Sequence, residues 1–414
     1  MKKSLMLGVA LLSSMSLLLG GCSLSKEDIP EANEYLSDTN ENETDAADEA
    51  STLSSEVVVI NDLFEPTLEP EESEASDSSS EATTEEADKP KIDSEPVDIV
   101  FFGDSQLANG KNDGTDIASL MQKRIPNSRI YNMAIGGTTA TLEKTTTDPS
   151  LETLTSTSFY GMANCFAGKA DRYATLAAGY PDVLEVMNSI TPEEVDYYVL
   201  SYGTNDFING VPLDASQYDP TGTQVHALYN VLVMCVDTLK DISPDARIIF
   251  MTPFYGIYVA EDGTYIGDSY IVSNGQGTLS EYADKIKNVV EDKELILFDG
   301  MYQSKFDLYL DTASQYLADN LHLSLTGRQI VARLVSHEIN FREKNEPYAY
   351  LENDYIKIAE FDPFEDYRYS EGLMKKYYPE SWEKYIVGEF PLAQPSDEAV
   401  AQYKSEQESQ DGDN

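Results

Sequence analysis

The sequence predicts an α/β protein with three layers (α/β/α), in which helices cover both faces of a doubly wound, parallel, five-stranded sheet. Two observations predict this fold class. From residue 95 onward, apolar runs of strand length alternate with segments of helical periodicity. Several of these runs are apolar on successive residues, as strands are when both of their faces are buried. Strand–helix–strand alternation of this kind is typical of a parallel sheet covered on both faces.

The expected strands are short runs rich in Val, Ile, Phe and Tyr. They cover residues 97–102, 129–134, 195–202, 246–251 and 294–299. The expected helices cover residues 116–125, 224–242, 279–293 and 325–339. In the longest of these, apolar residues recur at helical spacing from Leu228 to Leu239, and Pro244 marks its end. These elements place one domain at residues 95–342, an ordinary size for a single domain.

Residues 1–21 have the layout of a secretory signal peptide. Lys2 and Lys3 precede an apolar run that is too short to favour a transmembrane helix, and small residues precede Cys22. The residues that end at Cys22, LGGC, resemble the lipobox of bacterial lipoproteins. This resemblance implies that Cys22 is lipidated and that the protein is extracytoplasmic, anchored to the bacterial cell membrane through its lipid alone. Plain secretion, with cleavage near this position, is the alternative.

The segment that follows is strongly acidic. Between residues 23 and 90 there are 22 Asp or Glu and two Lys, which accounts for 20 of the 46 net negative charges. Such a segment buries too little apolar surface to offset the entropy lost on ordering, so residues 22–94 are expected to form a disordered tether. Basic residues do not cluster anywhere in the chain, which makes nucleic acid an unexpected partner.

Cysteine and histidine usage indicates no metal site. The chain has no CxxC motif and no His/Cys grouping with the spacing of metal ligands, so neither a metal nor another cofactor is expected. With Cys22 assigned to the anchor, Cys165 and Cys235 remain. Cys235 reads as a small buried apolar residue, although a disulfide between the two stays open.

The tripeptide Gly-Asp-Ser occurs twice, ending at Ser105 and at Ser269. Ser105 directly follows the first expected strand, at the carboxyl end, which is where parallel sheets place their sites. Ser269 comes after Asp262-Gly263, a dipeptide that predicts a type I′ hairpin, and this puts Ser269 on a rim loop. Ser105 is therefore the candidate nucleophile, and Ser269 is not.

Other chemistry-bearing residues follow the remaining strands. The second strand leads into Gly136-Gly137, the third into Asn205, and the last is followed by Asp319 and His322. The three-residue spacing lets the Asp319 carboxylate reach the imidazole and fix its tautomer, as a catalytic triad requires. The two other histidines, at positions 226 and 337, lie within expected amphipathic helices and read as structural residues. Taken singly, the glycines, the asparagine and the aspartate could each be turn residues.

In this order the blocks resemble those of the GDSL-type, or SGNH, serine hydrolase family, over roughly residues 95 to 341. The resemblance implies a flavodoxin-like sheet and ester cleavage through an acyl-enzyme. It implies a triad of Ser105, His322 and Asp319, in which the serine attacks and the histidine accepts its proton. It also implies an oxyanion hole made by the backbone N–H groups of Ser105 and Gly137 and the side-chain amide of Asn205.

A few positions depart from the family pattern, and none removes a reacting group. They are Gln106 in place of the usual apolar residue after the serine, Asn109 and Ala134 in place of glycines, and Leu323 where proline is frequent. Asp104 and Asp206 each neighbour a residue of the predicted site. We expect both to shape loops and to take no part in the chemistry.

The family includes lipases, thioesterases and carbohydrate deacetylases, and an extracytoplasmic location argues against acyl-CoA. Residues 138–194 and the hairpin near Asp262 are expected to lie over the active face. Segments expected there are rich in Gly, Ser, Thr, Asp and Tyr, which favours O-acetyl groups on carbohydrate or cell-surface polysaccharide as the substrate. The alternatives are a lipase acting on longer acyl esters, an O-acyltransferase, and a non-catalytic glycan-binding lipoprotein. The oligomeric state stays open.

The C-terminal part has a different composition. Residues 343–395 form an extension with twelve aromatic residues between Tyr348 and Phe390, which are expected to pack the extension onto the domain. Residues 396–414 are polar and are expected to form a disordered tail.

Overall fold

The computed structural model describes residues 95–216, 223–345, 349, 355–362, 371–377, 379–389 and 395–411. The predicted signal peptide, lipidated cysteine and tether lie outside the described residues. Five parallel strands form the main sheet, in the order β2-β1-β3-β4-β7. They are β1 (Val97–Gly103), β2 (Ser128–Asn132), β3 (Tyr197–Ser201), β4 (Arg247–Met251) and β7 (Ile296–Phe298). The fold class and all five predicted strands are confirmed.

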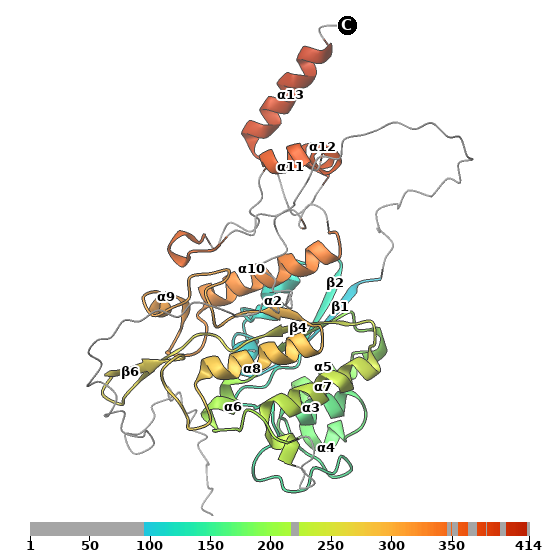
Figure 1. The fold of residues 1–414 in the computed structure, drawn as a ribbon. Helices are drawn as coiled ribbons and strands as arrows, with labels where there is room; N and C mark the ends of the chain where they lie inside the picture. The colour runs from blue at the N-terminus through green and yellow to red at the C-terminus, as the bar shows by residue number, and fades with distance from the viewer. Residues whose placement is uncertain are drawn as a thin grey trace, which may run out of the picture.

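Helices cover both faces of this sheet (Figure 1). One layer contains α2 (Ile117–Gln122) and α10 (Leu325–Arg342), and the other contains α3 (Phe159–Phe166), α7 (Leu228–Ile242) and α8 (Leu279–Asp292). Shorter helices are α1 (Ser105–Ala108), α4 (Arg172–Leu176), α5 (Pro181–Asn188), α6 (Thr204–Ile208) and α9 (Ala313–Tyr316). The four predicted helices are all present, and the one expected at 224–242 begins as a 3₁₀ turn (Thr223–His226) before α7.

The strand order places a topological switch beside β1. From β1 the chain moves to β2 on one side and then returns to β3 on the other. The loops that leave β2 and β3 therefore diverge on either side of the carboxyl end of β1, which is the place where open α/β sheets bind their ligands. All five residues of β3 are buried, as the continuous apolar run predicted.

Residues 138–194 are expected to lie over the active face, but the first helix of this segment, α3, lies in the core instead. All eight residues of α3 are buried, and the helix packs on the sheet beside α7. The Phe102 ring lies 5.7 Å from that of Phe159 and 5.6 Å from that of Phe166, centroid to centroid. Gly161 allows this packing, because a Cβ at that position would lie 2.0 Å from the Ser156 carbonyl oxygen. The aromatic residues of α3 therefore serve the core.

The excursion after β4 is a hairpin, as predicted, formed by antiparallel β5 (Ile257–Val259) and β6 (Tyr265–Asp268). The predicted type I′ turn is wrong. Such a turn needs a positive φ at both central residues, but of Asp262 and Gly263 only the glycine has one, at 83°. The turn begins earlier, since Gly263 N–H donates to the Ala260 carbonyl at 2.9 Å, so the glycine occupies its fourth position.

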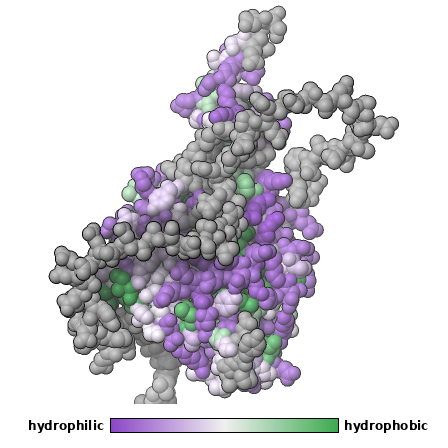
Figure 2. All heavy atoms as spheres, viewed as in Figure 1, coloured by the Kyte–Doolittle hydropathy of each residue, from purple (hydrophilic) through white to green (hydrophobic). Residues whose placement is uncertain are grey.

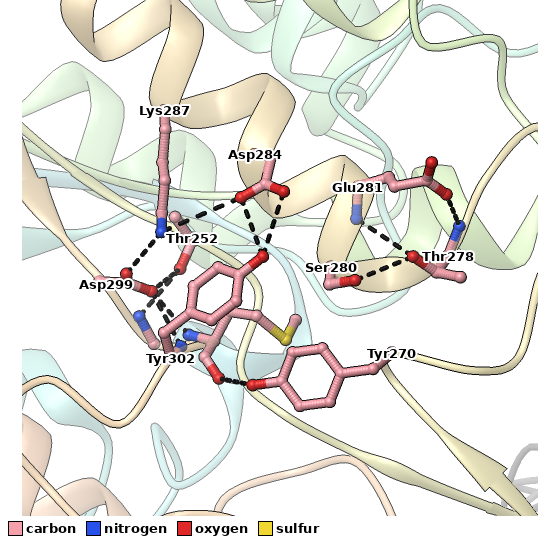
Figure 3. Close-up of polar contacts among 11 residues, drawn as sticks. Thr252, Tyr270, Thr278, Ser280, Glu281, Asp284, Lys287, Asp299 and Tyr302 are labelled. Carbon is pink, nitrogen blue, oxygen red and sulfur yellow. Dashed lines mark hydrogen bonds and ion pairs between the residues drawn. The ribbon is translucent and has the colours of Figure 1, made fainter. Parts of the chain in front are cut away.

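Polar contacts hold the segment after the hairpin and the loop after β7 onto α8 (Figure 3). Tyr302 donates its hydroxyl to Asp284, at 3.0 and 3.1 Å, and the Lys287 ammonium lies 3.9 Å from the centroid of the Tyr302 ring. Lys287 also pairs with Asp299 at 2.7 Å, and the Tyr270 hydroxyl donates to the Met301 carbonyl at 3.0 Å. The loop that leaves β7 therefore starts in a fixed direction.

Part of the C-terminal extension packs on the domain. Ile356 forms a parallel bridge with Phe306, and its carbonyl accepts the Asp307 N–H at 3.2 Å. The guanidinium of Arg333 on α10 lies 4.7 Å from the centroid of the Phe361 ring. These contacts support the predicted packing for residues 355–362.

Residues further along form a second small apolar cluster. Its core is Met374, Trp382, Tyr385 and Ile386, on α11 (Glu371–Tyr377) and α12 (Pro379–Ile386). Against it packs α13 (Asp397–Asp411), through Ala399, Val400 and Tyr403. The prediction of a disordered tail from 396 is therefore wrong over residues 397–411. The composition of this segment is rich in charge, but Ala399, Val400 and Tyr403 lie at helical spacing and pack on the apolar cluster of α11 and α12.

Cys165 and Cys235 are both buried free thiols, so the structure shows no disulfide between them. Over the described ranges, no helix combines the length and the apolar character needed to span a bilayer.

Candidate active site

The structure brings Ser105, His322 and Asp319 into one hydrogen-bonded line. Ser105 Oγ lies 2.8 Å from His322 Nε2, and His322 Nδ1 lies 2.8 Å from Asp319 Oδ2. A carboxylate can only accept, so the imidazole proton is on Nδ1 and the lone pair of Nε2 faces the serine hydroxyl. This is the arrangement in which a histidine can take the hydroxyl proton while the serine attacks a carbonyl.

The electrostatics of the line favour a basic imidazole. The hydrogen bond to Asp319 raises the pKa of His322 above its ordinary value, against the opposing effect of burial. Burial would raise the pKa of Asp319, but hydrogen bonds from the His322 side chain and from the backbone of His322 and Leu321 outweigh it and lower that pKa to about 2. Asp319 is therefore an anion at any pH at which the imidazole is neutral.

His322 sits in a loop whose backbone is closely bonded. Asp319 Oδ1 accepts the N–H of Leu321 at 2.8 Å and that of His322 at 2.7 Å, which makes Asp319 both a turn residue and the partner of the imidazole. The Ala318 N–H donates to the His322 carbonyl at 2.8 Å. Ser324 caps α10 directly afterwards, accepting the Gly327 N–H at 3.2 Å, as its position before the helix predicted.

The glycine pair after β2 lies beside the serine. A Cβ on Gly136 would lie 3.7 Å from the Ser105 Cβ, and Gly137 is exposed with a φ of 79°. A side chain at 137 would be strained at this φ, whereas glycine adopts it freely. Within the described part of the chain, the N–H groups of Ser105 and Gly137 donate to no protein acceptor, which leaves them available to an oxyanion.

Asn205 lies on the other side of the serine, in the first turn of α6, but its amide is engaged. Nδ2 lies 3.0 Å from the Thr138 carbonyl and 3.2 Å from Asp104 Oδ2. These contacts hold the amide beside the loop that carries Gly137. For Asn205 to donate to an oxyanion, the longer contact with Asp104 must be shared or released when substrate binds.

Asp104 and Asp206 are buried, and each accepts backbone N–H groups, Asp104 at the start of α1 and Asp206 in the loop after Gly137. Asp104 caps α1 by accepting the Gln106 N–H at 2.9 Å, and burial raises its pKa to about 7. Asp206 accepts the N–H groups of Ala140 at 2.8 Å and Thr141 at 3.1 Å, and so secures the loop after Gly137. Asp206 shapes a loop, as expected, whereas Asp104 caps a helix and contacts the Asn205 amide. Their ties to Asn205 and to the glycine loop had no signal in the sequence.

The remaining candidates lie apart from this line. Ser269 has no exposed surface, and its hydroxyl bonds to the N–H and carbonyl of Gly256 at 2.8 and 3.1 Å. It lies in the turn directly after β6, where its side chain is buried and structural. His226 bonds through Nδ1 to the Leu142 carbonyl at 2.9 Å, and His337 is buried in α10, where desolvation lowers its pKa to about 4.

No cluster of three or more His, Cys, Asp or Glu that could hold a metal ion occurs in the part of the chain that the structure describes.

The fold and the line of Ser105, His322 and Asp319 define a serine ester hydrolase. The model of the GDSL-like lipase/acylhydrolase family matches residues 101–330, which is more than half of the chain, and the protein belongs to this family. Among curated proteins, none matches the sequence.

Several solved structures resemble the chain at low identity. One is a possible lipase from Chitinophaga pinensis, with 16% identity, covering 60% of this chain and 99% of that chain, at a TM-score of 0.40. Another is a member of the lipolytic protein G-D-S-L family from Veillonella parvula, with 14% identity, 58% and 96% coverage and a TM-score of 0.35. A third is a variant of an acetyl xylan esterase from Geobacillus stearothermophilus, with 19% identity, 59% and 95% coverage and a TM-score of 0.34. Likenesses this distant indicate nothing about the substrate.

Proposed function

We propose that this hydrolase is an extracytoplasmic, membrane-anchored esterase that removes O-acetyl groups from carbohydrate, with Ser105 as nucleophile, His322 as general base and Asp319 as its partner. The line of two 2.8 Å hydrogen bonds from Ser105 to Asp319 is the observation that carries the proposal. Attack by Ser105 Oγ on the ester carbonyl forms the acyl-enzyme after the alcohol leaves with a proton from His322. Water activated by the same histidine then releases the acid.

The small and polar residues around Ser105 support an acetyl group on a polar alcohol. Gly136, Gly137 and Asn209 are exposed on the loops that flank the serine. The face of the molecule seen in Figure 2 is mostly hydrophilic and carries only small, separate hydrophobic patches. Hydroxyl-rich substrates suit the exposed loops of Gly136, Gly137 and Asn209, because their polar groups keep hydrogen-bond partners on binding.

A lipase acting on longer acyl esters is the second candidate. Two exposed isoleucines favour it: Ile208, 40% exposed, lies three residues after Asn205, and Ile271 is 66% exposed. Their segments adjoin, since the Asn274 amide donates to the Phe207 carbonyl at 2.6 Å. Together they could contact an acyl chain longer than acetyl.

The experiment measures kcat/KM for acetyl, butyryl and octanoyl esters of one leaving group, on a protein lacking residues 1–90, together with acetate release from acetylated polysaccharides. The proposal expects the acetyl ester to be preferred and acetate to be released. A preference that rises with chain length, with no acetate released from any glycan, would assign the protein to the lipases. Product that forms only when a glycan acceptor is supplied would make it an O-acyltransferase.

Membrane anchoring through Cys22 is tested separately. Two acyl chains on one cysteine anchor a protein durably, whereas a single chain is marginal. Cys22→Ala should leave the precursor unprocessed or release the mature protein into the medium, as followed by cell fractionation. An unmodified N-terminus beyond Cys22 in the wild-type protein, found by mass spectrometry, would exclude the lipoprotein.

A further inference from the structure

Gln106, the residue after the serine, departs from the family's usual apolar residue. It lies in α1 and is 3% exposed. Its amide reaches across to the loop that carries His322: Nε2 donates to the Leu321 carbonyl at 2.8 Å, and Oε1 accepts the Leu323 N–H at 3.2 Å. Both contacts are buried, and they join positions more than 200 residues apart in the chain.

The two peptide groups that flank His322 contain four hydrogen-bonding groups, and each of them has a partner. Two partners are local, because Asp319 accepts the His322 N–H and Ala318 donates to the His322 carbonyl. The other two are the Nε2 and Oε1 atoms of Gln106. The local bonds shape the loop, but they do not set its distance from the serine. Of these four bonds, only the two from Gln106 join the loop to the helix that begins at Ser105.

We propose that Gln106 is a positioning residue, which holds both peptide groups of His322 and thereby sets the 2.8 Å contact between Ser105 Oγ and His322 Nε2 before substrate binds. This proposal rests on the proposed function of Ser105 and His322. Gln106 touches neither substrate nor the reacting atoms. An amide suits the task, since it donates with one atom and accepts with the other.

The two hydrogen bonds from Gln106 to the Leu321 carbonyl and the Leu323 N–H form a clamp on the histidine loop. Loss of this clamp should lower turnover more than substrate binding. Gln106→Met keeps the length and apolar volume of the side chain but removes both hydrogen bonds. A displacement of about 1 Å between reacting groups can cost a hundredfold, so we expect kcat to fall about 10- to 100-fold with KM changed less than about twofold. Labelling of Ser105 by an organophosphorus probe should slow by a similar factor.

Asn230 supplies a matched control. On α7, this amide donates to the Ala215 carbonyl at 3.1 Å and accepts the Ala215 N–H at 2.8 Å, and its side chain is buried. Asn230→Leu removes the same kind of clamp from a loop that does not carry His322. It should lower the melting temperature as Gln106→Met does, and leave kcat within about twofold of wild type.

Gln106→Glu gives a readout that packing alone would not. An ionised carboxylate can accept the Leu323 N–H, but it cannot donate to the Leu321 carbonyl, whereas a protonated one can do both. Charged or titratable groups beside this position are Asp104, which accepts the Gln106 N–H, and His322 and Asp319 on the loop that Gln106 contacts. Arg328 is a fourth, and its guanidinium donates to the Leu323 carbonyl at 2.9 Å. The ratio of kcat/KM, variant over wild type, should therefore rise as the pH falls, while the ratio for Gln106→Met stays flat.

The experiment measures kcat, KM and probe labelling for the wild type and these three variants from about pH 5 to about pH 9, with melting temperatures. Wild-type kcat in Gln106→Met, or equal losses of kcat in Gln106→Met and Asn230→Leu, would overturn the positioning role. A ratio for Gln106→Glu that is flat with pH would also overturn it. Wild-type protein that neither hydrolyses esters nor is labelled at Ser105 would instead refute the proposed function.

Discussion

The substitution Asp319→Asn should change the tautomer of His322 and keep the shape of the loop that carries it. Asp319 Oδ1 accepts two backbone N–H groups, and Oδ2 faces His322 Nδ1. In the variant, the amide oxygen must occupy the Oδ1 position, because only an oxygen can accept from those N–H groups. The amide nitrogen then faces Nδ1 and donates to it. The imidazole proton moves to Nε2, and His322 can no longer accept the proton of Ser105.

The expected loss is large although the loop is kept. The wrong tautomer lowers kcat by about 10⁴-fold in a buried triad. The Asp319 side chain is 43% exposed, so water can partly replace it. We therefore expect kcat to fall roughly 10³-fold, which corresponds to about 4 kcal/mol in activation free energy.

The assay is kcat/KM for an aryl acetate from about pH 5 to about pH 9, the range in which histidine titrates. A general base works only when neutral, so the raised pKa of His322 moves the acid limb of the wild-type profile to higher pH. Removing the negative charge at position 319 lowers that pKa, and the acid limb of the residual activity should move to lower pH.

Asp171→Asn is the matched control. Its Oδ1 also accepts N–H groups two and three residues ahead, from Tyr173 at 2.9 Å and Ala174 at 3.1 Å, but no histidine faces its other oxygen. This variant should keep wild-type kcat and an unmoved acid limb. If Asp319→Asn lost less than about tenfold and its acid limb stayed in place, the reasoning about the tautomer would be refuted.

Three further predictions concern the serines, the oxyanion and the core. Ser105→Ala should abolish hydrolysis and organophosphorus labelling, while Ser269→Ala keeps both and loses about 1–3 kcal/mol of stability; the reverse pattern of labelling would contradict the assignment. Asn205→Ala should lower kcat by about 10²- to 10³-fold with the protein still folded by circular dichroism, and an unchanged kcat would make the amide a turn residue only. Gly161→Ala should destabilise the protein by about 1–3 kcal/mol in urea titration, because the added methyl meets the Ser156 carbonyl; an unchanged midpoint would show that α3 can shift at no cost.

The strands and long helices could be predicted because their burial is periodic. A strand such as β3, buried along its whole length, leaves a continuous apolar run, and α8 leaves its buried residues at helical spacing. The same reasoning failed for α3, because small and aromatic residues mixed with Gly and Asn read as a loop. Its burial depends on Phe102, about 60 residues earlier in the chain, and no local pattern reveals that contact.

The reacting groups could be predicted from the ends of the strands, since the carboxyl ends of parallel strands meet at one edge. The contacts that support these groups could not be predicted from the sequence. The ties of Asp104 to Asn205 and of Asp206 to Ala140 join residues about 65 to 100 positions apart through side-chain oxygens. From the sequence alone, an aspartate next to a site residue could equally be a solvated turn residue. Only the fold shows which backbone groups its carboxylate bonds.

The strand order also explains why the histidine loop needs added contacts. Gly137 and Asn205 follow β2 and β3, the two direct neighbours of β1, so the sheet itself places them on either side of Ser105. His322 follows β7, at the sheet edge two strands beyond β3, and a connection of more than 20 residues brings it back to β1. Pairing in the sheet cannot set the end of such a connection to within a few tenths of an ångström.

Three contacts reach the histidine loop from different elements. They are the bond from the Ile257 N–H to the Asn320 carbonyl at 2.9 Å, the Arg328 contact and the Gln106 clamp. Of these, only the clamp starts from the helix that carries the serine, which is why loss of the Gln106 bonds should alter turnover, whereas loss of the Ile257 or Arg328 contact should alter mainly stability.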